Sequence, residues 1–320
     1  MKEAVPEKQE GKRIMPDGFG STASVPALPR WRIWVLAARP KTLAAAVAPV
    51  LMGTAMAWAD GGFHLPSALF ALIGALLIQI GTNFANDYAD YLKGADTATR
   101  KGPLRVTAAG LVTPEAMRRA TALTFALAVV AGLYLIWRGG WPVLAIGLLS
   151  ILFGILYTSG RYALAYLGLG ELFVLIFFGP VAVGGTYYVQ TLTITQEVLL
   201  MGLAPGLIST GILLVNNVRD IEEDRQAGKR TPVVRFGRAF GVGLYACCLL
   251  GALLLPVVWY LFTYRHGGAM AVLALLPASV RAIRTLALER DGAVLNALLA
   301  ATGRLLLLYS LLFSIGWILT

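Results

Sequence analysis

The sequence is poor in the residues that build redox pairs and soft-metal sites. It has only two cysteines and two histidines in 320 residues. Cys247 and Cys248 are neighbours inside an apolar run, and we interpret them as small core residues. His64 and His266 fall in predicted connections far from the acidic clusters described below. A redox pair, a metal site or a catalytic base built on these four residues is therefore not expected.

Charge is also scarce, since 14% of the residues are charged and 58% are hydrophobic. This balance excludes an ordinary soluble domain and favours a polytopic membrane protein. Runs of about 20 apolar residues are the unit that crosses a bilayer as a helix. We therefore expect an all-α polytopic membrane protein of about nine transmembrane helices. The candidate spans are 42–59, 65–84, 120–137, 141–158, 164–189, 197–215, 241–263, 268–288 and 293–319.

The net charge of +10 is explained by the membrane topology of the basic residues and does not indicate a nucleic-acid partner. If the N-terminus is cytoplasmic, 24 of the 27 Lys and Arg residues fall on the cytoplasmic side. Arg138 and Arg265 fall outside, and Arg304 lies within the last span. This asymmetry follows the positive-inside rule. It predicts a multi-pass protein in a lipid bilayer with a cytoplasmic N-terminus and both acidic loops on the same side.

The first 29 residues differ from the rest of the chain. They carry charged residues, Gly, Pro and Ser and lack the central apolar region of a signal peptide. We expect residues 1–29 to form a disordered cytoplasmic tail. Residues 30–320 are expected to form one transmembrane domain.

Two acidic clusters stand out against the apolar runs that precede them. Asn83 and Asp87 are four residues apart in the first cluster, and Asn216 and Asp220 repeat this spacing in the second. On a helix, residues four apart lie on one face. Opposed carboxylate clusters suit hard divalent cations such as Mg²⁺, which often bridges to substrate phosphates. The candidate metal ligands are Asn83, Asp87, Asp90, Asp96, Asn216, Asp220 and Asp224.

Basic residues follow each acidic cluster. The first cluster is followed by Lys93, Arg100, Lys101 and Arg105, and the second by Arg225, Lys229, Arg230 and Arg235. Metal and cations around an oxyanion are the arrangement that stabilises a departing phosphate or diphosphate. The alternative is that both segments are ordinary charged loops. Because the pattern occurs twice, we interpret the chain as two related halves that each contribute one cluster to a central site.

Other polar residues leave alternatives open. Arg39 and Lys41 open the first span and are either topology signals or part of the site. Tyr157 either borders the site or belongs to an interfacial belt. Glu171 and Arg304 lie within spans, where an ionisable group is expected to have a partner. We favour structural partners for both and expect Arg304 to face the bundle interior.

The motifs resemble the UbiA superfamily of intramembrane aromatic prenyltransferases. The resemblance covers about residues 35–319. Within the superfamily, the motifs are most similar to those of the branch that prenylates 1,4-dihydroxy-2-naphthoate in menaquinone synthesis. The pieces that carry it are Arg39–Leu43, Asn86–Thr97, Lys101–Arg105, Tyr157–Thr158, Leu164–Glu171 and Asp220–Thr231. A third aspartate is displaced from the general pattern to Asp96, and a proline expected after Gly160 is absent.

The resemblance implies helices around a central cavity that is open to the cytoplasm and to lipid. It implies transfer of a polyprenyl chain from its diphosphate to the aromatic acid, with loss of CO₂ and pyrophosphate, in a bacterial-type cytoplasmic membrane. Asp87, Asp90, Asp220 and Asp224 would be catalytic and hold Mg²⁺. Lys93, Lys101, Arg105, Lys229 and Arg230 would contact the diphosphate, and Arg39, Lys41 and Tyr157 the acceptor.

Two further hypotheses remain. One is a related enzyme that uses 4-hydroxybenzoate or homogentisate. The other is a cation-coupled secondary transporter, but transporters place their site near the midplane on broken helices. Both acidic clusters here are predicted at cytoplasmic helix ends, which favours diphosphate chemistry. No obligate protein partner is evident in the sequence.

Overall fold

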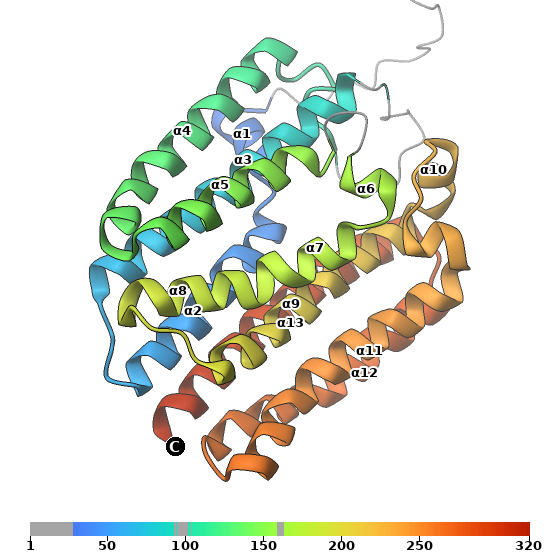
Figure 1. The fold of residues 1–320 in the computed structure, drawn as a ribbon. Coiled ribbons are helices and arrows are strands. Elements are labelled where there is room, and N and C mark those ends of the chain that lie inside the picture. Colours follow the sequence, from blue (N-terminus) through green and yellow to red (C-terminus); the bar gives the residue numbers. More distant parts are fainter. Residues whose placement is uncertain (1–27, 93, 95–101, 103, 159–162) are drawn as a thin grey trace, which may run out of the picture.

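The computed structural model describes residues 28–92, 94, 102, 104–158 and 163–320, and these residues are helical apart from short connections (Figure 1). The elements are α1 (Arg30–Ala38), α2 (Pro40–Ala59), α3 (Leu65–Leu92), α4 (Pro114–Gly139), α5 (Trp141–Leu156), α6 (Leu164–Leu167), α7 (Gly170–Ile176), the π-helical η1 (Phe177–Val181), α8 (Ala182–Thr191), α9 (Gln196–Arg219), α10 (Ile221–Gln226), α11 (Pro232–Thr263), the 3₁₀-helical η2 (Gly267–Leu275), α12 (Leu276–Leu288) and α13 (Gly292–Leu319).

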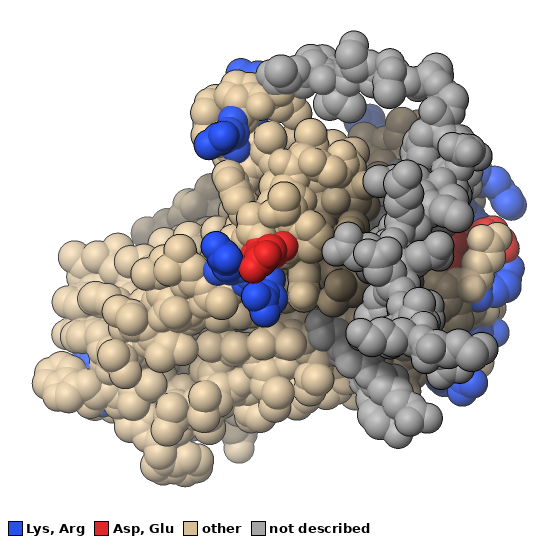
Figure 2. All heavy atoms as spheres, turned by 90° about the horizontal axis from the view of Figure 1, so that it is seen from above, with Lys and Arg blue, Asp and Glu red and all other residues tan. Residues whose placement is uncertain are grey.

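The predicted membrane-protein class is confirmed. In the described part of the chain, eight helical segments are long and apolar enough to cross a membrane. The remaining predicted span is α5, which is apolar but has only 16 residues. On the face seen in Figure 2, charged residues gather in small groups and a broad surface carries none, as lipid contact requires. Most of the predicted 1–29 tail lies outside the described residues.

The helix that follows each acidic segment begins in the same way. Thr113 accepts a hydrogen bond from the backbone N–H of Ala116 at 3.2 Å, and Thr231 accepts one from Val234 at 3.2 Å. Each threonine precedes a proline in the first helical turn, where the missing N–H costs nothing. The membrane helix that follows the acidic segment therefore begins with the same type of Thr–Pro cap in both halves.

The first acidic cluster lies on a helix and not in a loop. The apolar run predicted a span ending near residue 84, but α3 continues to Leu92. Its 28 residues extend for about 42 Å at 1.5 Å per residue, which exceeds a bilayer core of roughly 30 Å. Asp87 and Asp90 therefore lie on the last turns of α3, where the helix outruns the bilayer core.

The fifth predicted span does not begin at residue 164. The short helix α6 ends at Leu167, the following Gly168 has φ 78°, and α7 starts at Gly170. A Cβ at Gly168 would lie 2.2 Å from the carbonyl oxygen of Arg230, so only glycine fits this contact. The break turns α6 toward the segment that carries Arg230 and leaves Glu171 in the first turn of α7.

Two cores hold the molecule together. The larger one is formed by α2, α8, α9, α11, η2, α12 and α13. Helix α9 is its central helix, because most of its residues are buried. The smaller core joins α1, the end of α3, residues 106–112 and the start of α4. The expectation for Arg304 was wrong, because its side chain is exposed on the outside of α13. Depth along a helix does not specify which way a residue faces.

Candidate functional site

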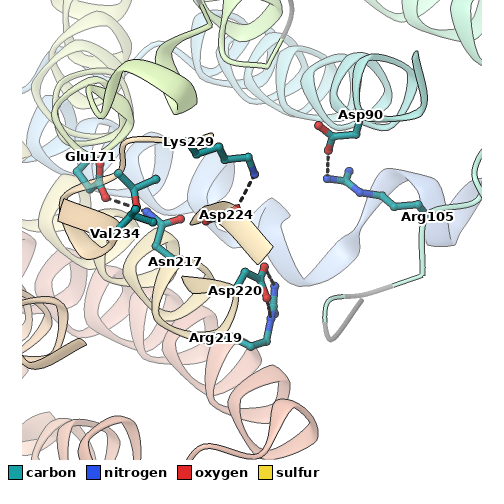
Figure 3. A network of polar contacts seen from close by, with 10 residues as sticks. Asp90, Arg105, Glu171, Asn217, Arg219, Asp220, Asp224, Lys229 and Val234 are labelled. Carbon is teal, nitrogen blue, oxygen red and sulfur yellow. Dashed lines mark hydrogen bonds and ion pairs between the residues drawn. The ribbon is translucent and has the colours of Figure 1, made fainter. Parts of the chain in front are cut away.

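The functional candidates surround one cavity of about 630 Å³ between α2, α3, α4, α5, α7, α8 and α9. Most of its walls are apolar, and its polar residues gather where α3 and α9 end. Tyr157, Asn86, Asn217 and Thr158 line this polar part together with carboxylates and cations from both halves. Figure 3 shows Arg105 pointing toward Asp90, Lys229 toward Asp224 and Arg219 toward Asp220. The arrangement suits a ligand with one charged end and one apolar end.

The first half contributes a carboxylate and a cation that contact each other. Arg105 donates to Asp90, and both side chains are at least nine-tenths buried. Asp87 holds the segment that carries Arg105, because its Oδ1 accepts the backbone N–H of Thr107 at 3.1 Å. Asp87 itself does not line the cavity in this arrangement. One aspartate thus positions the segment while the next receives its arginine.

The second half places Asp220 where α9 ends. Arg219 donates from Nε to Oδ1 and from Nη2 to Oδ2 of Asp220, both at 2.6 Å. A third nitrogen, Nη1, donates to the side-chain oxygen of Asn296 on α13. Carboxylates at the end of a membrane helix are costly without a cation among them. The arginine that meets this need directly precedes the aspartate, and the sequence interpretation assigned it no role.

Asp224, on the short helix α10, has its own cation. Lys229 Nζ lies 2.7 Å from Asp224 Oδ1 and 5.9 Å from the ring centre of Tyr166. Burial raises the pKa of the Asp224 carboxyl above its usual range, against the opposing effect of Lys229. Burial alone would lower the pKa of Lys229, but the Asp224 carboxylate outweighs it and the pKa is raised. Lys229 therefore stays charged at neutral pH.

Glu171 differs from the other carboxylates on the cavity wall. Its Oε1 accepts a hydrogen bond from Asn217 Nδ2 at 2.8 Å, so this contact is with a neutral amide and not with a cation. This agrees with the structural partner favoured for Glu171. Thr158 donates to Asn86 Oδ1 at 2.6 Å and joins α3 to the end of α5. The sequence interpretation assigned no role to Asn86, Asn217 or Thr158, although Asn86 and Thr158 belong to the motifs that carry the family resemblance.

Arg39 lies at the sharp junction between α1 and α2. Its φ of 52° is unusual for a non-glycine residue, and the proline that follows disfavours continued α-helix at this position. The amide of Asn83 secures the junction by donating to Ala38 O at 2.9 Å and to Thr42 Oγ1 at 3.1 Å. Arg39 and Lys41, the cations predicted to contact the acceptor, both line the cavity.

The structure brings together most of the predicted site residues. Those on the cavity wall are Arg39, Lys41, Asn83, Asp90, Arg105, Tyr157, Asn216, Asp220, Asp224 and Lys229. Arg230 is exposed and does not line the cavity, and its backbone N–H donates to Tyr166 O. Lys93, Asp96, Lys101 and Arg161 lie outside the described residues.

The donor set fits a hard cation in its chemistry. The candidate ligands offer carboxylate and amide oxygens, the atoms that Mg²⁺ prefers. As arranged, the described residues contain no group of three or more Asp, Glu, His or Cys side chains close enough to hold a metal ion. In Figure 3, Asp90, Asp220 and Asp224 each face a cation of the protein.

Comparison with known proteins identifies the family. The model of the UbiA prenyltransferase family matches residues 46–302. The chain belongs to this family. It is 39% identical over 293 residues to the 1,4-dihydroxy-2-naphthoate octaprenyltransferase of Escherichia coli, covering 90% of this chain and 95% of the relative. The enzyme of the same name from Mycobacterium tuberculosis is 39% identical over 279 residues, covering 87% and 94%.

Solved structures of UbiA homologues share the fold. One from Archaeoglobus fulgidus, bound to GPP and Mg²⁺, has a TM-score of 0.62 at 14% identity and covers 90% of this chain and 100% of its own. One from Aeropyrum pernix K1 has a TM-score of 0.62 at 17% identity, with 91% and 98% covered. Membership of this prenyltransferase family favours the enzyme over the transporter, and the chain is a multi-pass membrane protein.

Proposed function

We propose that this UbiA-family enzyme transfers a polyprenyl chain from its diphosphate to 1,4-dihydroxy-2-naphthoate, giving a demethylmenaquinol for menaquinone synthesis. The observation that carries the proposal is a single cavity with acids and cations at one end and apolar walls elsewhere. Two relatives named for this acceptor match most of the chain at 39% identity. Related acceptors such as 4-hydroxybenzoate remain the alternative to be tested.

The charged end of the cavity would receive the diphosphate. Asp87, Asp90, Asp220 and Asp224, with Asn83 and Asn216, are the proposed Mg²⁺ ligands, and Asp96 is a further candidate outside the described residues. A bound Mg²⁺ would offset the negative charge that develops on the departing diphosphate. Arg105 and Lys229 would turn from their carboxylates toward phosphate oxygens. Lys93, Lys101 and Arg230 are proposed to contribute from the neighbouring segments.

The apolar walls would keep water from the reacting carbon. The electron-rich ring forms the new C–C bond to the allylic carbon, and the breaking C–O bond leaves its electron pair on diphosphate. Loss of CO₂ returns a bonding pair to the ring, so atoms and electrons balance. Arg39 and Lys41 would hold the acceptor carboxylate at the cavity edge, with Tyr157 beside it.

The test is a transfer assay on membranes that contain the protein. Dihydroxynaphthoate, a polyprenyl diphosphate and Mg²⁺ are supplied, and product masses are measured. The expected product has gained the prenyl chain and lost CO₂. Parallel reactions with 4-hydroxybenzoate and homogentisate test the alternative. A faster reaction with either of them, or no product with dihydroxynaphthoate, would reject the proposed acceptor.

We further propose that residues 30–320 form one catalytic domain in a bacterial-type cytoplasmic membrane. Its N-terminus and both acidic segments would face the cytoplasm, as the distribution of Lys and Arg indicates.

A further inference from the structure

Glu171 stands apart from the other carboxylates on the cavity wall. Asp90, Asp220 and Asp224 each contact a cation. Glu171 is only 8% exposed, yet the side chain that contacts it among the described residues is the neutral amide of Asn217. A buried carboxylate without a cation is costly. The Asn217 contact therefore gives Glu171 a structural partner but leaves its charge uncompensated.

Glu171 lies close to the charged end of the cavity. Its partner Asn217 is three residues before Asp220 on α9, which is about 4.5 Å along the helix axis. Glu171 therefore marks the level at which the polar end gives way to the apolar walls. In the proposed reaction, the acceptor attacks the carbon that is bonded to the diphosphate. The acceptor ring consequently has to lie at this same level.

The wall beside this carboxylate is aromatic. Tyr157 packs on the start of α7, since a Cβ at Gly170 would lie 3.3 Å from the Tyr157 hydroxyl oxygen. The Phe153 ring centre on α5 lies 4.6 Å from that of Phe173 and 5.4 Å from that of Phe177. All four rings line the cavity. Because aromatic rings pair favourably edge to face or offset, this wall suits a flat aromatic guest.

The charge of Glu171 determines which part of the acceptor it could receive. Dihydroxynaphthoate carries one carboxylate and two hydroxyls. Glu171 would repel the carboxylate, which is left to Arg39 and Lys41, whereas a hydroxyl donates to an ionised carboxylate. One hydroxyl adjoins the carboxylate of the acceptor and can bond to it. The other has no such neighbour and needs a partner in the apolar cavity.

We infer that Glu171 accepts a hydrogen bond from the acceptor hydroxyl that does not adjoin the carboxylate, and thereby selects a dihydroxy over a monohydroxy acceptor. The inference rests on the proposed prenyl transfer and assigns a recognition residue within it. A hydrogen bond to an ionised group is stronger than one between neutral groups. An acceptor that lacks this hydroxyl would leave the buried carboxylate without its donor, which is the situation that gives strong discrimination.

The test compares 1,4-dihydroxy-2-naphthoate with 1-hydroxy-2-naphthoate at saturating donor. The ratio of their kcat/KM values is the discrimination, and we expect roughly 100-fold or more for the unchanged protein. Glu171→Gln keeps an oxygen for the Asn217 amide but removes the charge, so the discrimination should fall roughly tenfold. Glu171→Met removes the oxygen as well and should lower it further. The ratio compares two acceptors in one variant, so a smaller amount of folded protein does not change it.

Glu197→Gln is the matched control. Glu197 also lies in the first turn of a membrane helix but does not line the cavity, so this variant should keep the full discrimination. Unchanged discrimination in both Glu171 variants would overturn the inference. So would a loss in Tyr157→Phe together with full discrimination in Glu171→Met, because the hydroxyl would then belong to Tyr157.

A second measurement uses the unchanged protein alone and does not depend on any variant folding. The acceptor is methylated on the hydroxyl that does not adjoin the carboxylate, which removes the proton that Glu171 would receive. We expect kcat/KM to fall at least as far as it does when that hydroxyl is absent. Full use of the methyl ether would contradict the inference. If the unchanged protein gives no product with dihydroxynaphthoate itself, the proposed function fails instead.

Discussion

Arg219 binds the carboxylate of its own neighbour, Asp220, through two parallel hydrogen bonds of 2.6 Å. Adjacent residues on a helix do not face each other. The pair forms because α9 ends at Arg219, and Asp220 leaves the helical conformation with φ −100° and ψ 16°. The same guanidinium reaches Asn296 on α13 and ties the site to a second helix.

Arg219→Lys should weaken both the fold and the reaction. Lysine keeps the charge but loses the planar fork that reaches Asp220 and Asn296 together. We expect a loss of about 1.5–3 kcal/mol in unfolding free energy and at least tenfold lower transfer. Thermal unfolding in detergent and the membrane assay measure the two effects. Arg118→Lys is the control, since Arg118 is an exposed partner of Glu115 at 3.7 Å. Equal behaviour of the two variants would contradict the assignment.

Two substitutions of Asp87 separate metal binding from loop anchoring. Asparagine keeps an oxygen for the Thr107 N–H but removes the negative charge, whereas alanine removes both. If Asp87 is a Mg²⁺ ligand, both variants should lose nearly all transfer, and only Asp87→Ala should also lose protection of residues 104–112 from proteolysis. An active Asp87→Asn would leave Asp87 as a loop anchor alone. Full activity in EDTA would reject the metal site altogether.

Lys41→Met should impair use of the acceptor more than use of the donor. Each charge-assisted contact contributes on the order of 1.5–3 kcal/mol, so the acceptor KM should rise roughly tenfold or more. Arg304→Met is the matched control, because Arg304 is exposed on α13 and does not line the cavity. An unchanged acceptor KM, or an equal loss with both substrates, would return Lys41 to a topological role.

Removal of the Lys229 charge should shift the acid limb of the pH–rate profile. Burial already raises the pKa of Asp224, so its carboxylate is protonated sooner than a free aspartate as pH falls. Lys229→Met removes the opposing charge and should raise that pKa further, which moves the loss of activity to higher pH. Arg225→Met, at an exposed pair with Glu222, should leave the limb in place. A rate that falls equally at all pH values would limit Lys229 to diphosphate contact.

Cysteine labelling tests the topology. Gly94 and Gly228 are poor sites for a reporter, because both have positive φ and any side chain there is strained. In a background without Cys247 and Cys248, Ala227→Cys should react with an impermeant reagent only after the cytoplasmic face is opened. Thr193→Cys, in the turn between α8 and α9, should react in intact cells. The reverse pattern would invert the proposed orientation.

The spans could be predicted well from the sequence because long apolar runs identify membrane helices. It could not predict where α3 ends, since Asn83–Asp90 is polar and yet continues the helix. It also could not predict the partner of Asp90, because Arg105 lies 15 residues away in an irregular segment. The outward direction of Arg304 was missed because α13 is apolar on most sides, so no periodicity marked its face. The local sequence pattern predicted which segments span the membrane and how deep a residue lies along its helix. It did not predict which face of the helix the residue lies on or which distant residue it contacts.

If Mg²⁺ and the diphosphate bind at the charged end as proposed, the three cation–carboxylate pairs would make the binding of one depend thermodynamically on the binding of the other. A metal alone would take the carboxylates away from Arg105, Arg219 and Lys229, and these buried or partly buried cations would lose the partners they have here. A diphosphate alone would draw the cations away and leave carboxylates in the same condition. When both ligands bind, the carboxylates contact the metal and the cations contact the diphosphate, so both kinds of charge keep a partner of opposite sign. Each should therefore raise the affinity for the other by the same factor, and the apparent Mg²⁺ constant should fall as the donor concentration rises.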